Sequence, residues 1–121
     1  MMIMIVDDEE SSRTLLADVL QKKFPGARIM QAETVNEAQD KLVELPADIL
    51  FTDFNMIGEN GLQLIRFVRG HERLKNTPIA MITARYRLQA LVEKARELKF
   101  ELFGKPIEEE KIFHFLSGIN A

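Results

Sequence analysis

Short apolar runs alternate with amphipathic segments along the whole chain, and this alternation constrains the fold more than any other feature of the sequence. Each run is followed by apolar side chains at helical spacing, such as Leu64, Ile65 and Val68 after the third run. Strands and helices that alternate through short connections form a parallel sheet with helices on both faces. The sequence therefore predicts a doubly wound α/β fold with five parallel strands, at residues 2–6, 28–32, 48–53, 79–83 and 100–103.

The order of these strands can be predicted from the common arrangements of doubly wound sheets. With five strands, the flavodoxin-like order 2-1-3-4-5 is favoured, in a three-layer sandwich of helices, sheet and helices. This order puts the first and third strands side by side, and ligands bind outside their carboxyl ends. At 121 residues the chain has the size of one domain, and we expect a single domain over residues 1–121.

Capping residues and apolar positions predict where the first two helices begin and which side chains they bury. Ser11 and Ser12 are expected to cap the first helix, whose buried stripe is expected to include Leu15. Thr34 and Glu37 have the spacing of a capping box at the start of the second helix.

The second half of the chain has two less regular connections. Residues 54–61 contain two glycines and two asparagines, so we predict a loop there. A fourth helix is predicted from the spacing of its apolar residues, which are Leu88, Leu91, Val92, Ala95 and Leu98. Residues 98–101 lack the glycine that commonly closes a helix, which leaves the boundary between this helix and the last strand poorly defined.

The composition excludes several classes of function. A formal net charge of -3 and a pI of about 5.4 do not indicate binding to nucleic acid or to anionic membrane. The absence of cysteine excludes disulfides, thiolate metal sites and cysteine nucleophiles. The N-terminus is apolar for only six residues and has no basic leader, so we expect neither a signal peptide nor a membrane span. Cytoplasm is the expected location.

Polar side chains stand where the predicted strands end. Asp7 and Asp8 follow the first strand, Asp53 ends the third, Thr83 ends the fourth, and Lys105 follows the fifth. Carboxylates placed close together repel one another unless a cation neutralises them, and Mg²⁺ prefers such oxygen ligands while leaving room for phosphate. A carboxylate can act as a nucleophile, and an ammonium and a hydroxyl can bind phosphoryl oxygens. We therefore expect Mg²⁺ and phosphoryl-transfer chemistry at this edge of the sheet.

Each of these residues also has a structural explanation when it is taken alone. Acidic residues at positions 7–10 are favourable at the start of a helix, and Asp53 could be a turn residue. Thr83 could cap a helix, and Lys105 could be a solvated charge. It is their joint occurrence at successive strand ends that favours a site.

With these residues in place, the chain resembles a response-regulator receiver domain (CheY-like), the phosphoacceptor module of two-component signalling. The resemblance covers the whole chain and rests on the strand-end residues in their order. It rests also on the segment after the third strand. The matching motifs are Asp7-Asp8, Asp53-Phe54-Asn55-Met56, Gly61-Leu62, Thr83 and Lys105-Pro106.

The resemblance implies the roles of the metal ligands. Asp53 would accept a phosphoryl group from a phosphohistidine. Asp8 and Asp53 would ligate Mg²⁺ directly, the main-chain carbonyl of Asn55 would add a third protein ligand, and Asp7 would act through bound water.

The resemblance also implies how the phosphoryl group is held and reported. Lys105 would pair with the phosphoryl group, and its bond to Pro106 would be cis. Thr83 would move toward the phosphate and report its arrival to the face formed by the fourth helix, fifth strand and fifth helix.

Partners and activity follow from the same resemblance. A sensor histidine kinase or a phosphotransfer protein would donate the phosphoryl group, and an output protein would bind the face just named. No nucleic acid or membrane contact is expected, and a homodimer is one further arrangement that the family allows. Such a protein catalyses its own phosphorylation and dephosphorylation and is not a turnover enzyme.

Two positions depart from the family pattern. The family usually has an aromatic residue three positions before the lysine, where this chain has Leu102, so the usual coupling of that residue to Thr83 is in question. Phe103 is a poor substitute because neighbours on a strand face opposite sides. Ile57 replaces the usual proline after the phosphoacceptor.

Two other functions use similar parts. A degenerate receiver would act as a phosphorylation-independent interaction module, which Leu102 favours and the intact strand-end residues oppose. A magnesium-dependent aspartyl phosphatase of the haloacid dehalogenase type would need a second acid two residues after its nucleophile, where this chain has Asn55. The chain is also too short to include a cap domain.

Overall fold

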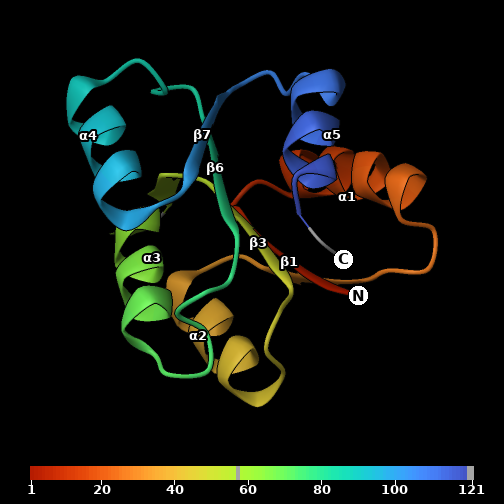
Figure 1. Cartoon of the computed structure of the whole chain (residues 1–121), viewed down its shortest axis with the longest axis horizontal. Helices are drawn as coiled ribbons and strands as arrows, with labels where there is room; N and C mark the ends of the chain where they lie inside the picture. The colour runs from red at the N-terminus through yellow and green to blue at the C-terminus, as the bar shows by residue number, and fades with distance from the viewer. Residues whose placement is uncertain (57, 120–121) are drawn as a thin grey trace.

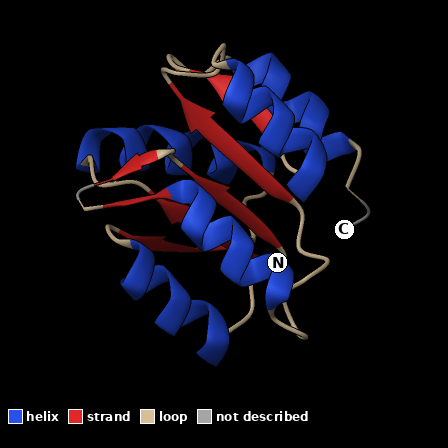
Figure 2. Ribbon diagram, turned by 90° about the vertical axis from the view of Figure 1, so that its left-hand side faces the viewer, coloured by secondary structure: helices blue, strands red, loops and turns tan. Residues whose placement is uncertain are grey.

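A computed structural model describes residues 1–56 and 58–119. In this part of the chain, strands and helices alternate from end to end (Figure 1), and Figure 2 shows the strands enclosed between helices. The elements are β1 (Met2–Val6), α1 (Glu10–Lys23), β2 (Arg28–Ala32), α2 (Val35–Glu44), β3 (Ile49–Thr52), β4 (Asn55–Met56), β5 (Glu59–Asn60), α3 (Gly61–Gly70), β6 (Ile79–Thr83), α4 (Gln89–Leu98), β7 (Glu101–Gly104) and α5 (Glu109–Ser117).

The main sheet has the predicted topology. Its order is β2-β1-β3-β6-β7 with every neighbouring pair parallel, and β6 and β7 are the fourth and fifth strands of this sheet along the chain. The order 2-1-3-4-5 is therefore confirmed. The prediction of a simple loop over residues 54–61 was wrong in part, because β4 and β5 pair there as a small antiparallel ribbon.

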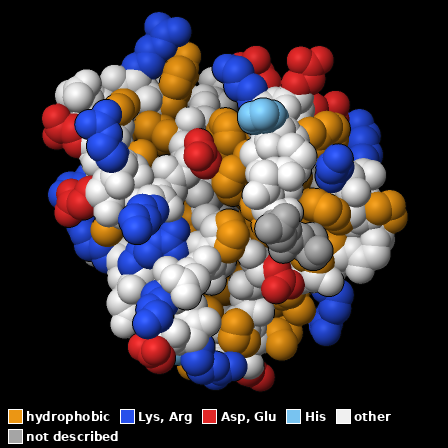
Figure 3. All heavy atoms as spheres, in the orientation of Figure 1, with side chains coloured by type: hydrophobic (Ala, Val, Ile, Leu, Met, Phe, Trp, Pro, Cys, Tyr) orange, Lys and Arg blue, Asp and Glu red, His pale blue; other side chains and the backbone are white. Residues whose placement is uncertain are grey.

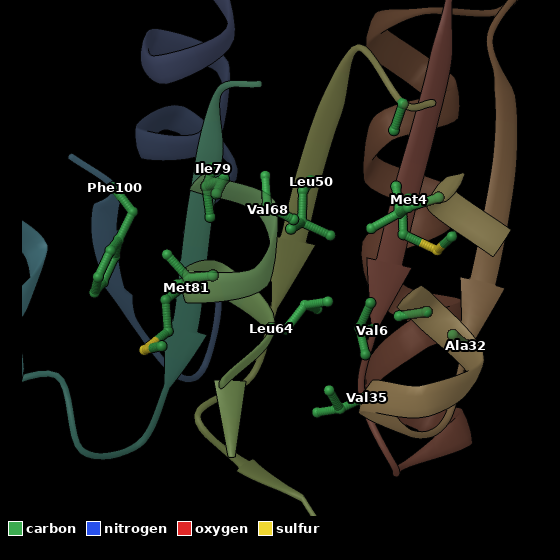
Figure 4. Packing of buried hydrophobic residues seen from close by; sticks show 14 of the residues in the cluster. Met4, Val6, Ala32, Val35, Leu50, Leu64, Val68, Ile79, Met81 and Phe100 are labelled. Atoms are coloured by element: carbon green, nitrogen blue, oxygen red, sulfur yellow. The ribbon is translucent and has the colours of Figure 1, made fainter. Parts of the chain in front are cut away.

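The core consists of two layers, one on each side of the sheet. Because successive residues of a strand face opposite sides, Ile3 and Ile5 of β1 join the layer under α1 and α5, whereas Met4 and Val6 join the layer under α2, α3 and α4. Figure 4 shows part of this second layer, with Met4, Val6 and Leu64 among the side chains drawn between the sheet and its helices. The central strands are buried on both faces, which is why they are almost continuously apolar.

The start of α1 differs from the prediction. The helix begins at Glu10 after the N-cap residue Glu9, and no side chain caps it. The expected capping by Ser11 and Ser12 is therefore wrong, because both serines lie inside the first turn.

The buried face of α1 also differs from the prediction. Leu15 is 53% exposed, while Arg13, Leu16, Val19 and Leu20 are buried. The buried stripe passes through the charged Arg13, which an apolar pattern does not reveal.

The structure also tests the predicted cap of α2 and the predicted fourth helix. Thr34 caps α2 as expected, accepting a hydrogen bond from the main-chain nitrogen of Glu37 at 3.1 Å. On α4, Leu91 is buried, but Leu88 and Val92 are 44% and 36% exposed. The predicted fourth helix is confirmed, with Leu88 as its N-cap residue. None of the described helices is both long enough and apolar enough to cross a membrane.

Lys99 closes α4 in place of a glycine. Its φ of 58° and ψ of 59° are left-handed, a conformation that costs a residue with a Cβ about 1 kcal/mol or more. Arg69 of α3 supports this turn by donating to the main-chain oxygens of Leu98 at 2.8 Å and Lys99 at 2.7 Å. These contacts satisfy carbonyls that a helix end leaves without partners.

Candidate functional site

The carboxyl ends of β1 and β3 place two aspartates side by side. Val6 and Thr52 are paired in the parallel register, and the main-chain nitrogen of Asp53 donates to the oxygen of Val6 at 3.0 Å. Asp7 and Asp53 directly follow these two paired residues. The strand order alone therefore brings them to one edge of the sheet.

Asp7, Asp8 and Asp53 form an acidic cluster. One carboxylate oxygen of each lies within 4.8 Å of the other two. Asp7 is 6% exposed and the side chain of Asp53 is 11% exposed. Their orientation is fixed from the main chain, because Asp7 Oδ1 accepts from the nitrogen of Glu9 at 2.9 Å and Asp53 Oδ1 accepts from the nitrogen of Phe54 at 2.7 Å.

Lys105 joins this cluster from the loop between β7 and α5. Its Nζ lies 3.0 Å from Asp7 Oδ2 and 3.0 Å from Asp53 Oδ2. Burial by itself lowers the pKa of the ammonium, but hydrogen bonds and charge from Asp7 and Asp53 outweigh burial and hold the pKa above its ordinary value. Lys105 is therefore cationic at neutral pH. The expected cis bond between Lys105 and Pro106 is confirmed.

The chemistry of this donor set fits a divalent cation. Three carboxylates and one ammonium leave two formal negative charges uncompensated within the cluster. All of the acidic donor atoms are oxygens, which Mg²⁺ prefers. Asp7, Asp8 and Asp53 are therefore the residues of the described chain that could hold such an ion.

Thr83 lies on the next strand, linked to Lys105 through the main chain. It is 2% exposed at the end of β6, and its carbonyl oxygen accepts from the nitrogen of Lys105 at 3.1 Å. Its hydroxyl oxygen accepts from the main-chain nitrogen of Arg85 at 3.2 Å. The hydroxyl thus holds the turn that leaves the strand.

Asn55 lies in β4 and is exposed, two residues beyond Asp53. Its role as a metal ligand through the main-chain carbonyl stays a prediction. Ile57, where the family usually has proline, lies outside the described residues.

Arg13 supports the acidic cluster, and the sequence reasoning missed it. It is 7% exposed, and its Nη1 donates to the main-chain oxygen of Asp7 at 2.7 Å. Its other nitrogens donate to Gln31 at 3.2 Å and Glu33 at 3.4 Å. The available signal was periodicity, since Arg13 lies three residues before Leu16 on the same helix face.

Gly61 packs against the main chain of the central aspartate. A Cβ at this position would lie 2.1 Å from the carbonyl oxygen of Asp53, so only glycine fits. The nitrogen of Gly61 also donates to the oxygen of Phe54 at 2.7 Å. The start of α3 is thereby held close to the acidic cluster.

A cavity of about 200 Å³ opens beside Asp53 and Lys105. Its walls are mostly apolar and come from the first strand and helix and from the loop after β7, with Leu15, Leu16 and Ile107 among the lining residues. The acidic cluster therefore borders an apolar recess.

Comparison with known proteins identifies the family. A sequence model of the response regulator receiver domain matches residues 3–117, and the chain belongs to that family. It is a receiver domain, the class that accepts phosphoryl groups in two-component signalling. Receiver domains bind Mg²⁺ at an acidic pocket and interact with histidine kinases and output proteins, and they are generally not turnover enzymes.

Individual relatives agree with this assignment. The chain is 35% identical over 131 aligned positions to the chemotaxis protein CheY of Pseudomonas aeruginosa, covering 98% of this chain and 100% of that protein. It is 32% identical over 111 positions to the sensory transduction protein LytT of Bacillus subtilis, covering 91% of this chain but only 44% of LytT. The structure of Vibrio cholerae CheY4 matches with a TM-score of 0.85 at 24% identity, covering 98% of each chain, which supports the fold.

Proposed function

We propose that Asp53 accepts a phosphoryl group from a phosphohistidine of a sensor histidine kinase or phosphotransfer protein. The observation that carries this proposal is the position of Asp53 within one cluster that also contains two further carboxylates and the ammonium of Lys105, 3.0 Å away. Such an arrangement supplies a nucleophile together with groups that neutralise phosphoryl charge.

The reaction exchanges one bond to phosphorus for another. A carboxylate oxygen of Asp53 attacks the phosphorus, and the bond from phosphorus to the imidazole nitrogen breaks with its electron pair kept by nitrogen. The other ring nitrogen of the donor imidazole carries a proton when this bond breaks, so the products are an acyl phosphate on Asp53 and a neutral histidine on the donor. Lys105 offsets charge on the phosphoryl oxygens. Its raised pKa keeps the ammonium protonated for this role.

Mg²⁺ would neutralise the charge that gathers on the phosphoryl oxygens during transfer. In this proposal Asp8 and Asp53 ligate the ion directly, with the carbonyl of Asn55 as a third protein ligand, and Asp7 acts through bound water. The two uncompensated negative charges of the cluster support this role. Arg13 contributes by holding the main-chain carbonyl of Asp7.

The donor is proposed to approach over the apolar recess beside Asp53. Leu15 lines that recess and is 53% exposed, so it offers apolar contact area to a partner. A partner histidine that reaches Asp53 must enter from solvent, and the recess borders both Asp53 and Lys105.

Output is proposed to occur by protein binding at the α4–β7–α5 face once Thr83 has responded to the phosphoryl group. Leu88 and Val92 support this assignment because both are large apolar residues left exposed at or near α4. A second copy of the chain is an alternative occupant of the same face. We further propose that the domain works in the cytoplasm and contacts neither nucleic acid nor membrane.

Incubation with acetyl phosphate and Mg²⁺, followed by intact mass measurement, tests this function. The wild-type chain is expected to gain one phosphoryl group, and the gain should be lost in Asp53→Asn and in the presence of EDTA. Asp40→Asn is the matched control, because Asp40 is exposed on α2 and should leave the gain unchanged. A wild-type chain that gains no mass would support the second candidate, a phosphorylation-independent interaction module, which the replacement of the family's aromatic residue by Leu102 favours.

A further inference from the structure

The coupling position of the family offers no aromatic ring in this chain. Leu102 of β7 is half-buried and packs against the core layer under α4. Phe103 faces the other side of the sheet, where its ring centroid lies 5.8 Å from that of Phe115. Neither residue therefore supplies a ring beside Thr83 on the α4 side.

Tyr86 places a ring against the strand residue that is paired with Thr83. Thr83 of β6 is paired with Gly104 of β7. A Cβ built on Gly104 would lie 2.6 Å from both Cδ1 and Cε1 of Tyr86, so the tyrosine ring rests against the main chain of that glycine. Any larger residue at position 104 would displace the ring.

The same ring reaches the surface between α4 and β7. Tyr86 lines a cavity of about 700 Å³ together with Val92, Leu102 and Phe115, which belong to α4, β7 and α5. It is half-buried, so part of the ring remains available to a partner. Tyr86 therefore touches both the strand position paired with Thr83 and the groove on the α4–β7–α5 face.

The connection from Thr83 to Tyr86 is short. The hydroxyl of Thr83 accepts from the nitrogen of Arg85, the residue immediately before Tyr86, at 3.2 Å. If the hydroxyl turns toward a phosphoryl group on Asp53, this hydrogen bond is lost and the turn that carries Tyr86 is released. A change at Thr83 is then transmitted to the position of the ring.

We propose that Tyr86, from the loop between β6 and α4, carries the phosphorylation signal from Thr83 to the α4–β7–α5 face. This inference rests on the proposed function, because it requires a phosphoryl group on Asp53. It makes Tyr86 a positioning residue for the output surface, with Gly104 as the strand position that receives the ring.

Fluorescence can follow Tyr86 alone, because the chain has one tyrosine and no tryptophan. Acrylamide quenching of the tyrosine emission is measured before and after acetyl phosphate and Mg²⁺, with the phosphorylated fraction taken from intact mass of the same sample. We expect the quenching constant to change by about twofold as the ring moves between two environments. In Thr83→Ala, the change per mole of phosphorylated protein should be lost.

Variants at the two strand positions sharpen the test. Gly104→Ala should shift the quenching constant before any phosphorylation, because its Cβ occupies the place of the ring. Phe103→Leu is the matched control on β7, because Phe103 faces the other side of the sheet, and it should retain the response. A fully phosphorylated wild-type chain with unchanged Tyr86 quenching would overturn this inference and leave the proposed function standing, as would a normal response in Thr83→Ala. Failure of the wild-type chain to gain a phosphoryl group would overturn both.

Discussion

At the scale of single residues, Arg13 shows how a buried charge can organise a site without entering it. Its guanidinium donates to the main-chain oxygen of Asp7, to Gln31 and to Glu33, so it joins the turn after β1 to the segment at the end of β2. A buried cation is stable only while its hydrogen-bond acceptors remain in place, and Arg13 has three of them. Removing it leaves the carbonyl of Asp7 without this partner.

Arg13→Ala should therefore weaken both the fold and the metal site. We expect the free energy of unfolding to fall by about 2–4 kcal/mol, since a buried group loses its charged partner. Mg²⁺ binding, measured by calorimetry on the folded variant, should also weaken. Arg28→Ala is the control, because Arg28 is exposed on the edge strand and its loss should change little. Equal effects of the two substitutions would contradict this role for Arg13.

Lys99 is the second residue whose role is visible only in three dimensions. Lys99→Gly removes the Cβ from a left-handed position and should raise the free energy of unfolding by about 0.5–1 kcal/mol, net of the greater freedom of glycine in the unfolded chain. Urea unfolding measures the change. Lys94→Gly, within α4, should lower the same free energy by about 1 kcal/mol. Destabilisation by both substitutions would rule out strain at Lys99.

At the scale of elements, the start of α3 is fixed by its contact with the end of β3. Gly61→Ala would place a Cβ 2.1 Å from the carbonyl oxygen of Asp53, so the helix or the aspartate must move. We expect a loss of about 1–3 kcal/mol in the free energy of unfolding, as for other overpacked sites, and slower phosphorylation by acetyl phosphate.

The other end of the same helix supplies the control for this prediction. A Cβ on Gly70 would have no atom within 4 Å, so Gly70→Ala should be neutral or raise the free energy of unfolding by about 0.5–1 kcal/mol. Similar behaviour of the two variants would show that the contact between α3 and Asp53 does not hold Asp53 in place.

The elements also show what sequence could and could not predict. The central strands β1 and β6 were predictable because a central parallel strand is apolar along its whole length, and both match the predicted residues. The edge strand β2 is less apolar but also matches the predicted residues. The buried face of α1 was not predictable from its apolar residues, because this face includes the charged Arg13. The exposure of Leu88 and Val92 was not predictable, because an apolar pattern does not distinguish the core from exposed surface.

The position of Asp7 beside Asp53 in the acidic cluster was predictable from the order of the strands. Asp7 and Asp53 follow paired residues of adjacent strands, so the strand order suffices to bring them together. The contact of Tyr86 with Gly104 could not be anticipated, because it joins a loop to a strand that follows it in the chain. Contacts of this kind depend on the conformation of the loop and have no periodic signal.

At the scale of the whole molecule, the charge is unevenly distributed. Residues 61–99 contain nine Lys or Arg and three Asp or Glu, whereas the rest of the chain contains seven and 16. Several of these cationic side chains lie over α3 and α4, toward the left of Figure 3. An output partner that binds beside α4 would therefore meet a positive surface, which favours an acidic segment and makes association sensitive to salt.

The acidic cluster should link metal binding to stability. In EDTA, Asp8→Asn should raise the free energy of unfolding by up to about 1 kcal/mol, because one of three neighbouring negative charges is removed. Mg²⁺ should raise the melting temperature of the wild-type chain, since an ion that binds only the folded state stabilises it. The same ion should have little effect on Asp8→Asn. Equal stabilisation of both chains by Mg²⁺ would show that the ion binds elsewhere.

Locating the phosphoryl group in the chain is the most direct test of the account. The phosphorylated chain is reduced with borohydride, which converts an acyl phosphate to an alcohol, and peptide mass spectrometry then identifies the altered residue. We expect reduction at Asp53, dependent on Mg²⁺ and absent without the phosphoryl donor. Reduction at any other aspartate or glutamate, or none in a chain that has gained the phosphoryl mass, would contradict it.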